Sequence, residues 1–167
     1  MAIATDYMDS PLGKIKLVEE DGALKVVHFM NGEEAIGECS SSKLLIKVKQ
    51  ELQDYFDGRL QQFSFIPAIA QSGTDFQQRV WEMLTEIPFG KTISYRDLSI
   101  QLGDEKVIRA AASANGQNDI AIVVPCHRVI GSDGSLTGYA GGLWRKKWLL
   151  EHEAKWSGKP TQGDLFG

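Results

Sequence analysis

The chain has little of what several large classes of protein require. Its 167 residues include only two cysteines and three histidines, and these lack the close spacing of a structural zinc site. It also lacks an apolar run long enough to cross a membrane and a basic-then-apolar leader. We therefore expect no metal, no other cofactor, no membrane contact and a reducing, cytoplasmic location.

An excess of positive charge is missing as well. The formal net charge is −4. The excess of acidic side chains lies in residues 1–72, which carry seven basic and eleven acidic side chains. Residues 73–157 carry ten of each. A surface with equal numbers of acidic and basic side chains attracts nucleic-acid phosphates only modestly. Any nucleic-acid binding by the second half must then depend on a few well-placed basic residues.

The first half shows strand patterns followed by one helix pattern. Alternating apolar residues on both sides of Asp21-Gly22 predict a hairpin. Apolar residues spaced by four predict a helix over 44–56, and the residues 63–69 suggest another extended segment. We interpret residues 1–72 as an N-terminal α/β domain without catalytic residues.

The second half, residues 73–157, is predicted to be mainly helical. Thr74 to Gln77 has the pattern of a capping box at the start of a helix. Two short helices, 94–102 and 105–115, follow with Gly103 between them, which is the outline of a helix-turn-helix.

A last helix is expected over 143–154, and residues 158–167 are expected to form a flexible tail. The basic residues 145–147 at the start of this helix are most simply interpreted as a solvated face.

A thiol and an imidazole are adjacent at Cys126-His127. They follow the apolar run 120–124, which we interpret as a buried strand, and Pro125, which ends it. The thiolate is the reactive form of cysteine, and a nearby base or cation promotes it. Adjacent side chains of a strand point to opposite faces, so we expect a water between sulfur and imidazole. The alternative is a buried structural cysteine beside an incidental histidine.

Two further residues favour chemistry over structure alone. Glu153 can complete a Cys-His-Glu set in which a carboxylate orients the imidazole. Arg109 precedes the small residues 110–114, which would let a helix backbone approach DNA phosphates or the minor groove. An alanine-rich helix packed in a core is the other interpretation of that run.

In this order, the residues resemble the O6-alkylguanine-DNA alkyltransferases, DNA-repair proteins that are used once, and in particular the bacterial form without a metal-binding regulatory domain. The resemblance covers about Phe76 through Glu153. The matching blocks are Ile87-Pro88-x-Gly90-x-x-x-Ser94-Tyr95, Arg109-Ala110, Asn115-Gly116-x-Asn118, Pro125-Cys126-His127-Arg128-Val129-Ile130, Gly138-Tyr139-Ala140-Gly141-Gly142 and Leu149-Leu150-x-x-Glu153.

The resemblance implies a ribonuclease-H-like first domain and a catalytic role for five residues. Cys126 would accept the alkyl group irreversibly, and His127 would act through a water with Glu153 behind it. Tyr95 would help to rotate the damaged nucleotide out of the duplex and hydrogen-bond the departing guanine. Asn118 would brace the turn behind the site.

The resemblance also implies how substrate and DNA are bound. The partner would be double-stranded DNA that contains O6-alkylguanine, and also O4-alkylthymine, held through its minor groove by a monomer. Arg109 would fill the place of the flipped base, since an O6 atom inside a duplex is out of reach. The other contacts would come from Ala110, Ala111, Arg128, Val129, Tyr139 and Ala140.

Two alternatives and two departures from the family pattern accompany this interpretation. A non-catalytic relative that only binds alkylated DNA would carry tryptophan in place of Cys126. A small Cys-His-Glu hydrolase would need an oxyanion hole and would have no use for a helix-turn-helix. Asp104-Glu105 and Asp119 stand where many members have other residues, and the acidic pair would weaken attraction to phosphate.

Overall fold

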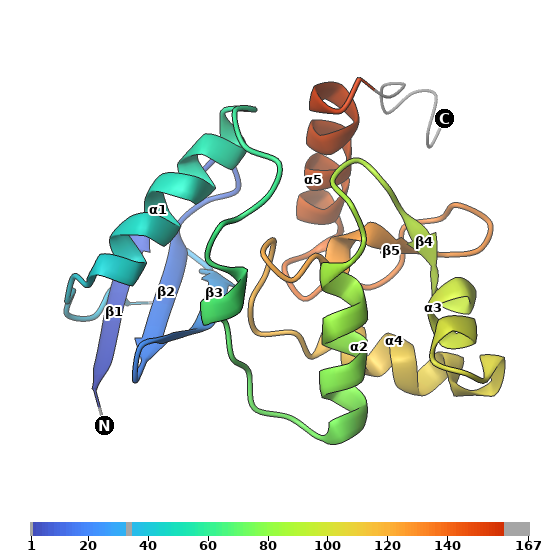
Figure 1. Ribbon diagram of the computed structural model, residues 1–167. Helices are drawn as coiled ribbons and strands as arrows, with labels where there is room; N and C mark the ends of the chain where they lie inside the picture. Colours follow the sequence, from blue (N-terminus) through green and yellow to red (C-terminus); the bar gives the residue numbers. More distant parts are fainter. Residues whose placement is uncertain (1, 33–34, 159–167) are drawn as a thin grey trace. The chain divides into compact units, whose positions relative to one another are not determined.

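The computed structural model describes residues 2–32 and 35–158, and the chain divides into two compact units (Figure 1). The first unit holds the residues up to Gln71 together with Asp119–Val123, and the second holds Ser72–Asn118 and the residues from Val124 onward. The tail predicted from residue 158 lies, apart from Gly158, outside the described residues. No helix in the described part of the chain is long and apolar enough to span a membrane.

The first unit is a three-stranded antiparallel sheet with one helix. Strands β1 (Ile3–Met8), β2 (Ile15–Glu20) and β3 (Ala23–Phe29) lie in that order. The predicted hairpin is confirmed, and both turn residues, Asp21 at φ 51° and Gly22 at φ 82°, have the positive φ that a tight two-residue turn needs.

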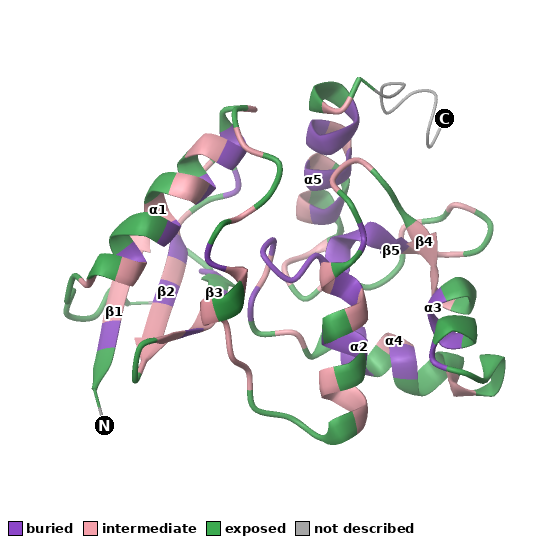
Figure 2. Cartoon of the chain, in the orientation of Figure 1, coloured by how far each residue is buried: buried purple, intermediate pink, exposed green. Residues whose placement is uncertain are grey.

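Helix α1 (Lys43–Phe56) confirms the helix expected over 44–56. It begins at Ser42, whose hydroxyl accepts a hydrogen bond from the amide of Leu45. One face of it is buried, and the purple segments that recur along α1 in Figure 2 mark these buried positions: Leu45, Val48, Leu52, Tyr55 and Phe56. Together, this helix and the sheet confirm the α/β class expected for the first domain.

Two predicted strands are wrong. Residues Ile66–Ala68 form a short 3-10 helix, and only Ile69 makes a bridge, to Leu24. In the run 120–124, Ile120 alone bridges to Val27 of the first unit. The chain then turns tightly at Ile122, at φ 70°, where the amide of Val123 bonds to the carbonyl of Ala121. An apolar run indicates burial, which is observed here, but does not fix the backbone conformation.

The second unit is mainly helical, as expected. Helix α2 (Asp75–Thr85) begins with the predicted capping box, in which Thr74 and Gln77 exchange hydrogen bonds of 2.9 and 3.1 Å. Helices α3 (Tyr95–Gln101) and α4 (Ile108–Gly116) form the expected pair, and the 3-10 turn Glu105–Val107 precedes α4. Gly103, at φ 106°, makes the turn between them.

A short parallel pair and a long helix complete the second unit. Strands β4 (Ile93–Ser94) and β5 (Val129–Ile130) pair in parallel, and α5 (Leu143–Trp156) confirms the last predicted helix. The indole of Trp81 on α2 donates a 2.9 Å hydrogen bond to the carbonyl of Ala114 on α4. This buried bond ties the helix-turn-helix to the rest of the unit.

The capping box of α2 gives a test of the fold. Thr74→Ala removes the oxygen that accepts from the Gln77 amide, so we expect the free energy of unfolding to fall by about 0.5–2 kcal/mol in a urea titration. Ser72→Ala, an exposed residue outside the cap, is the control. Equal losses in the two variants would show that the cap contributes nothing.

Candidate active site

Cys126 lies at the start of the 3-10 turn η3 (Cys126–Arg128), immediately before strand β5. Its thiol is buried, with 6% of the residue exposed. Two asparagine side chains hold the backbone around it. Asn115 donates to the carbonyl of Cys126 at 3.2 Å, and Asn118 donates to the carbonyl of Val124 at 2.8 Å. The expected bracing role of Asn118 is consistent with this position.

The surroundings of Cys126 favour the protonated thiol at rest. Burial raises the pKa of the Cys126 thiol, while a hydrogen bond from the Asn118 side chain and the charge of Lys146 act in the opposite direction. Because the thiolate is the nucleophile, this cysteine needs a base to take its proton.

The neighbouring imidazole belongs to a buried network around the carboxylate of Glu153. Nε2 of His127 lies 2.7 Å from Oε2 of Glu153, and both side chains are fully buried. Arg128 donates to the same carboxylate from Nε at 2.8 Å and from Nη2 at 3.0 Å. The amide of Gly90 adds a fourth contact of 3.2 Å. The carboxylate is therefore satisfied on both oxygens.

These contacts assign the charges of the network. Burial alone would raise the pKa of Glu153, but His127 and Arg128 bring it well below its usual range. Burial lowers the pKa of His127. The resting state is thus an ionised Glu153 balanced by Arg128, with a neutral His127 whose Nε2 proton faces the carboxylate.

In this tautomer the lone pair of His127 lies on Nδ1. Nδ1 has no hydrogen-bond partner among the described residues. It is the atom on which His127 can accept a proton, and Glu153 can then stabilise the resulting imidazolium.

Arg128 was expected to contact DNA, but only 6% of the residue is exposed. Besides Glu153, it donates from Nη1 to the carbonyl of Ile87 at 2.6 Å. A guanidinium held in this way can compensate the Glu153 charge, and it has no free face for a phosphate. The structure corrects the expected role to one of support.

Lys146 is the functional candidate that the sequence interpretation missed. It was placed on a solvated face, yet it is fully buried. Its Nζ donates to the carbonyls of Val129, Thr137 and Gly138 at 2.6, 3.0 and 3.3 Å and to the hydroxyl of Tyr95 at 3.4 Å. Burial lowers the pKa of Lys146 to about 8.

A pattern in the sequence could have identified Lys146. It lies three, four and seven residues before Leu149, Leu150 and Glu153, all of them buried. This is the spacing of one helix face, so Lys146 shares the buried face of α5.

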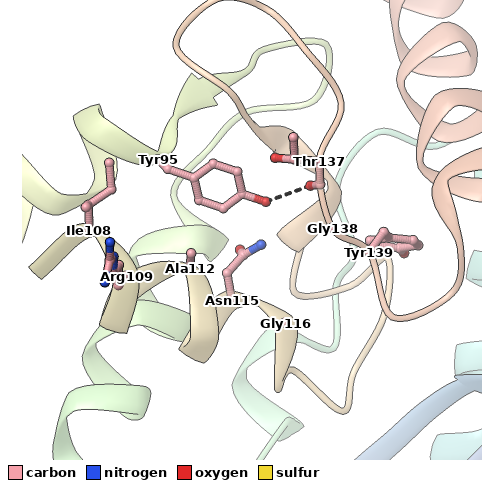
Figure 3. Close-up of a pocket in the computed structure, with 9 residues that line it drawn as sticks. All are labelled: Tyr95, Ile108, Arg109, Ala112, Asn115, Gly116, Thr137, Gly138 and Tyr139. Carbon is pink, nitrogen blue, oxygen red and sulfur yellow. Dashed lines mark hydrogen bonds between the residues drawn. The ribbon is translucent and has the colours of Figure 1, made fainter.

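A pocket of about 390 Å³ opens within the second unit, and its lining includes Tyr95, Thr137 and Gly138, the residues that Lys146 binds. Figure 3 shows Ile108 and Arg109 at one end and Tyr139 at the other, with the ring of Tyr95 between them. The hydroxyl of Tyr95 donates to the carbonyl of Thr137 at 3.0 Å. Burial raises the pKa of Tyr95, so its hydroxyl keeps its proton. The lining is completed by Ala112, Asn115, Gly116 and Gly138.

The other predicted contact residues lie in different surroundings. Arg109 and Ala110 are exposed on α4, whereas Ala111 is fully buried. Ala111 packs in the core, so the structure corrects its predicted DNA contact. Val129 is also buried, and its carbonyl is bound by Lys146. Ala140 is exposed, and Tyr139 lines the pocket.

The fold and the site together define a protein with a helix-turn-helix unit, a small pocket against that motif, and a buried thiol in the same turn as a histidine that is paired with a carboxylate. Within the described part of the chain, no cluster of His, Cys, Asp and Glu side chains could hold a metal ion.

Comparison with known proteins identifies the family. Residues 75–155 match the 6-O-methylguanine DNA methyltransferase DNA-binding domain, and residues 3–68 match the ribonuclease-like domain of the same family. The chain belongs to the 6-O-methylguanine DNA methyltransferase family. The two domain matches also confirm the expected ribonuclease-like first half and DNA-binding second half.

Individual relatives agree with this membership. A methylated-DNA–protein-cysteine methyltransferase of Methanosarcina barkeri is 41% identical over 152 residues, which cover 89% of this chain and 95% of the relative. The constitutive enzyme of Bacillus subtilis is 40% identical over 85% of this chain and 89% of its own. The crystal structure of the Mycobacterium tuberculosis protein in complex with DNA has a TM-score of 0.81 at 39% identity, covering 96% of this chain and 98% of that chain.

The buried network around Glu153 can be tested by removing its charge. Glu153→Gln leaves the guanidinium of Arg128 buried without a counter-charge, and we expect it to lower the free energy of unfolding by about 3–5 kcal/mol. The double variant Arg128→Met/Glu153→Gln should regain much of that loss. Both variants should transfer alkyl groups slowly, because His127 has lost its carboxylate.

The measurements are urea unfolding and single-turnover reaction with O6-benzylguanine. Glu151→Gln, on the same helix and more exposed, should match the unmodified chain in both. Recovery of the rate in the double variant would contradict the assigned role of Glu153.

Proposed function

We propose that this chain repairs DNA by moving the alkyl group of O6-alkylguanine onto the sulfur of Cys126, once per molecule. The observation that carries the proposal is the position of the Cys126 thiol. It belongs to the turn η3 that also carries His127, whose neutral imidazole is supported by the ionised carboxylate of Glu153, and this turn is in the unit that holds the pocket against the helix-turn-helix.

The transfer begins with loss of the thiol proton. His127 accepts this proton on Nδ1, through a water as the sequence interpretation expects, and Glu153 stabilises the imidazolium. The thiolate attacks the alkyl carbon, so that an S–C bond forms while the C–O6 bond breaks. The electron pair of the broken bond stays on the guanine.

The guanine that leaves must gain a proton on its ring. The Tyr95 hydroxyl is the donor, since it keeps its proton at neutral pH and lines the pocket. Tyr95 is restored by the proton that His127 holds, so the net result is a thioether and a normal guanine. Lys146, bonded to the Tyr95 oxygen, positions this hydroxyl.

Access to the O6 atom requires the damaged nucleotide to leave the duplex. Flipping costs a few kcal/mol, less for a poorly paired lesion. Arg109 is exposed at the rim of the pocket, from where its side chain can enter the gap in the base stack. The pocket volume of about 390 Å³ falls in the range of about 300–1,000 Å³ typical of small-molecule sites.

Four finer points belong to the same proposal. DNA is bound through its minor groove, with exposed Ala110 letting the α4 backbone come close. The protein acts as a monomer. O4-alkylthymine is a further substrate. The cytoplasmic location stays a prediction from cysteine usage.

Single use is the sharpest test of the proposed chemistry. With excess O6-benzylguanine, we expect one equivalent of guanine and one benzyl mass gain, located on Cys126 by peptide mass spectrometry. Cys126→Ser should transfer nothing, because a hydroxyl is a much weaker nucleophile at neutral pH. Cys39→Ser should react normally, since Cys39 is the other, exposed cysteine. Continued turnover would instead indicate a hydrolase.

The proposed role of Arg109 predicts a difference between two substrates. Arg109→Ala should slow repair of a duplex lesion at saturating DNA at least tenfold, yet leave reaction with free O6-benzylguanine near normal. A free base leaves no gap to fill. Arg96→Ala, an exposed arginine of α3 paired with Glu105, is the control and should keep both rates. Equal losses on both substrates for Arg109→Ala would place Arg109 in the pocket chemistry.

A further inference from the structure

Asn115 carries a buried acceptor that the proposed chemistry does not use. The residue is 3% exposed and lines the pocket from the last turn of α4. Its side-chain nitrogen donates to the carbonyl of Cys126 at 3.2 Å, whereas its oxygen, Oδ1, has no hydrogen-bond partner among the described residues. A buried acceptor without a donor is costly, so a ligand that supplies a donor is bound more favourably.

The orientation of this amide is fixed by its neighbour. A carbonyl oxygen can only accept hydrogen bonds, so the nitrogen of Asn115 must face the carbonyl of Cys126, and Oδ1 must point elsewhere. Figure 3 shows the amide directed from α4 toward the hydroxyl of Tyr95. Burial raises the pKa of Tyr95, and a hydrogen bond from the Asn115 side chain acts in the opposite direction. Asn115 therefore contacts both the proposed alkyl acceptor and the proposed proton donor.

Other acceptors in the lining of the pocket are already engaged. Lys146 donates to the carbonyls of Thr137 and Gly138. The carbonyl of Thr137 also accepts from the hydroxyl of Tyr95. A donor that enters the pocket meets in Oδ1 of Asn115 an acceptor with no competing partner among the described residues.

The base of O6-alkylguanine has one group that can donate to this oxygen. Alkylation at O6 removes the hydrogen from N1, and in DNA the sugar is bonded to N9. The 2-amino group is then the remaining N–H donor of the base. Building on the function proposed above, we propose that Oδ1 of Asn115 accepts a hydrogen bond from the 2-amino group of the flipped base. Asn115 is thus a residue that selects guanine lesions.

The same contact ranks the two proposed lesions. O4-alkylthymine has no N–H donor on its base, because alkylation at O4 removes the hydrogen from N3 and the base has no amino group. In the pocket it leaves Oδ1 of Asn115 unpaired. A site that hydrogen-bonds a substrate N–H discriminates against an analogue that lacks it. O6-alkylguanine is therefore the preferred lesion.

The first experiment compares two single-stranded oligonucleotides that differ only in the amino group. One contains O6-methylguanine and the other contains O6-methylhypoxanthine, and single strands remove the contribution of base pairing. The readout is the second-order rate constant of alkyl transfer below saturation, which includes binding and reaction. We expect the unmodified chain to react about tenfold faster with the guanine lesion. Asn115→Leu, of similar size but without an acceptor, should abolish this preference.

The ratio of the two rate constants separates this role from a purely structural one. Loss of the bond from Asn115 to the Cys126 carbonyl slows both oligonucleotides equally and leaves the ratio unchanged. Asn115→Asp keeps an acceptor oxygen and should keep the preference, although both rates fall. Gln101→Leu removes an exposed amide of α3 that is not part of the pocket lining, and it should match the unmodified chain.

The second experiment measures binding without transfer. In the Cys126→Ser chain, fluorescence anisotropy with short single strands should give an affinity about tenfold higher for the O6-methylguanine strand than for the O6-methylhypoxanthine strand. Adding Asn115→Leu should remove the difference, because neither base then meets an acceptor at this position.

Two results would overturn the assignment of Asn115. One is equal rate constants or equal affinities for the two strands, and the other is a preference that persists in Asn115→Leu. The proposed function fails separately. Absence of transfer to Cys126 from either strand would overturn that function, and an amine preference in binding that Asn115→Leu abolishes would still support the contact.

Discussion

The carboxylate of Glu153 is the group on which the second unit depends. A buried charge is costly unless every lone pair is engaged, and here imidazole, guanidinium and backbone amide donors surround it. The donors come from η3 and from the loop that holds Gly90. One charge thus joins the end of α5 to the turn that carries the nucleophile. The same contact that holds the fold together orients the imidazole of His127.

The contact between the Gly90 amide and the Glu153 carboxylate requires glycine at position 90. Its backbone has φ 79°, and a Cβ at this position would lie 2.5 Å from the Cβ of Ser157. Only glycine gives both the positive φ and the space that bring its amide to the Glu153 carboxylate. Lys146 performs a comparable task on the pocket side, where one ammonium group joins two parts of the chain by binding the carbonyl of Val129 and the carbonyls of the consecutive residues Thr137 and Gly138. The walls of the pocket are therefore fixed by polar groups, although its lining is largely apolar.

Much of this architecture could be predicted because local rules decide it. The turn at Asp21-Gly22 and the cap at Thr74 could be predicted because each depends on a few residues that are close in sequence. In both, the residue types present suit the local backbone conformation. The motif around Cys126 could be recognised because its residue types are consecutive in the sequence. Burial of Lys146 was not predicted, since a lysine is seldom placed inside and its partners are carbonyls that no sequence pattern marks.

The failed strand before Cys126 has a related cause. Hydrophobic runs report that residues are buried, and Ile122 is buried in a tight turn with positive φ, which β-branched residues rarely adopt. The prediction that Arg128 contacts DNA failed because the sequence does not show that this residue is buried. A surface role is the ordinary expectation for arginine, and its true partners, Glu153 and the carbonyl of Ile87, are distant in sequence.

Burial of Cys126 has a consequence for the lifetime of the protein. Sulfenic acid formation and glutathione mixed disulfides arise on exposed thiolates of low pKa, and Cys126 has neither property at rest. A molecule that can react once must keep its thiol reduced while it waits among peroxides and small electrophiles. Burial and a raised pKa both disfavour the exposed thiolate that those reagents attack, so the fold that holds Cys126 also protects it before it is used.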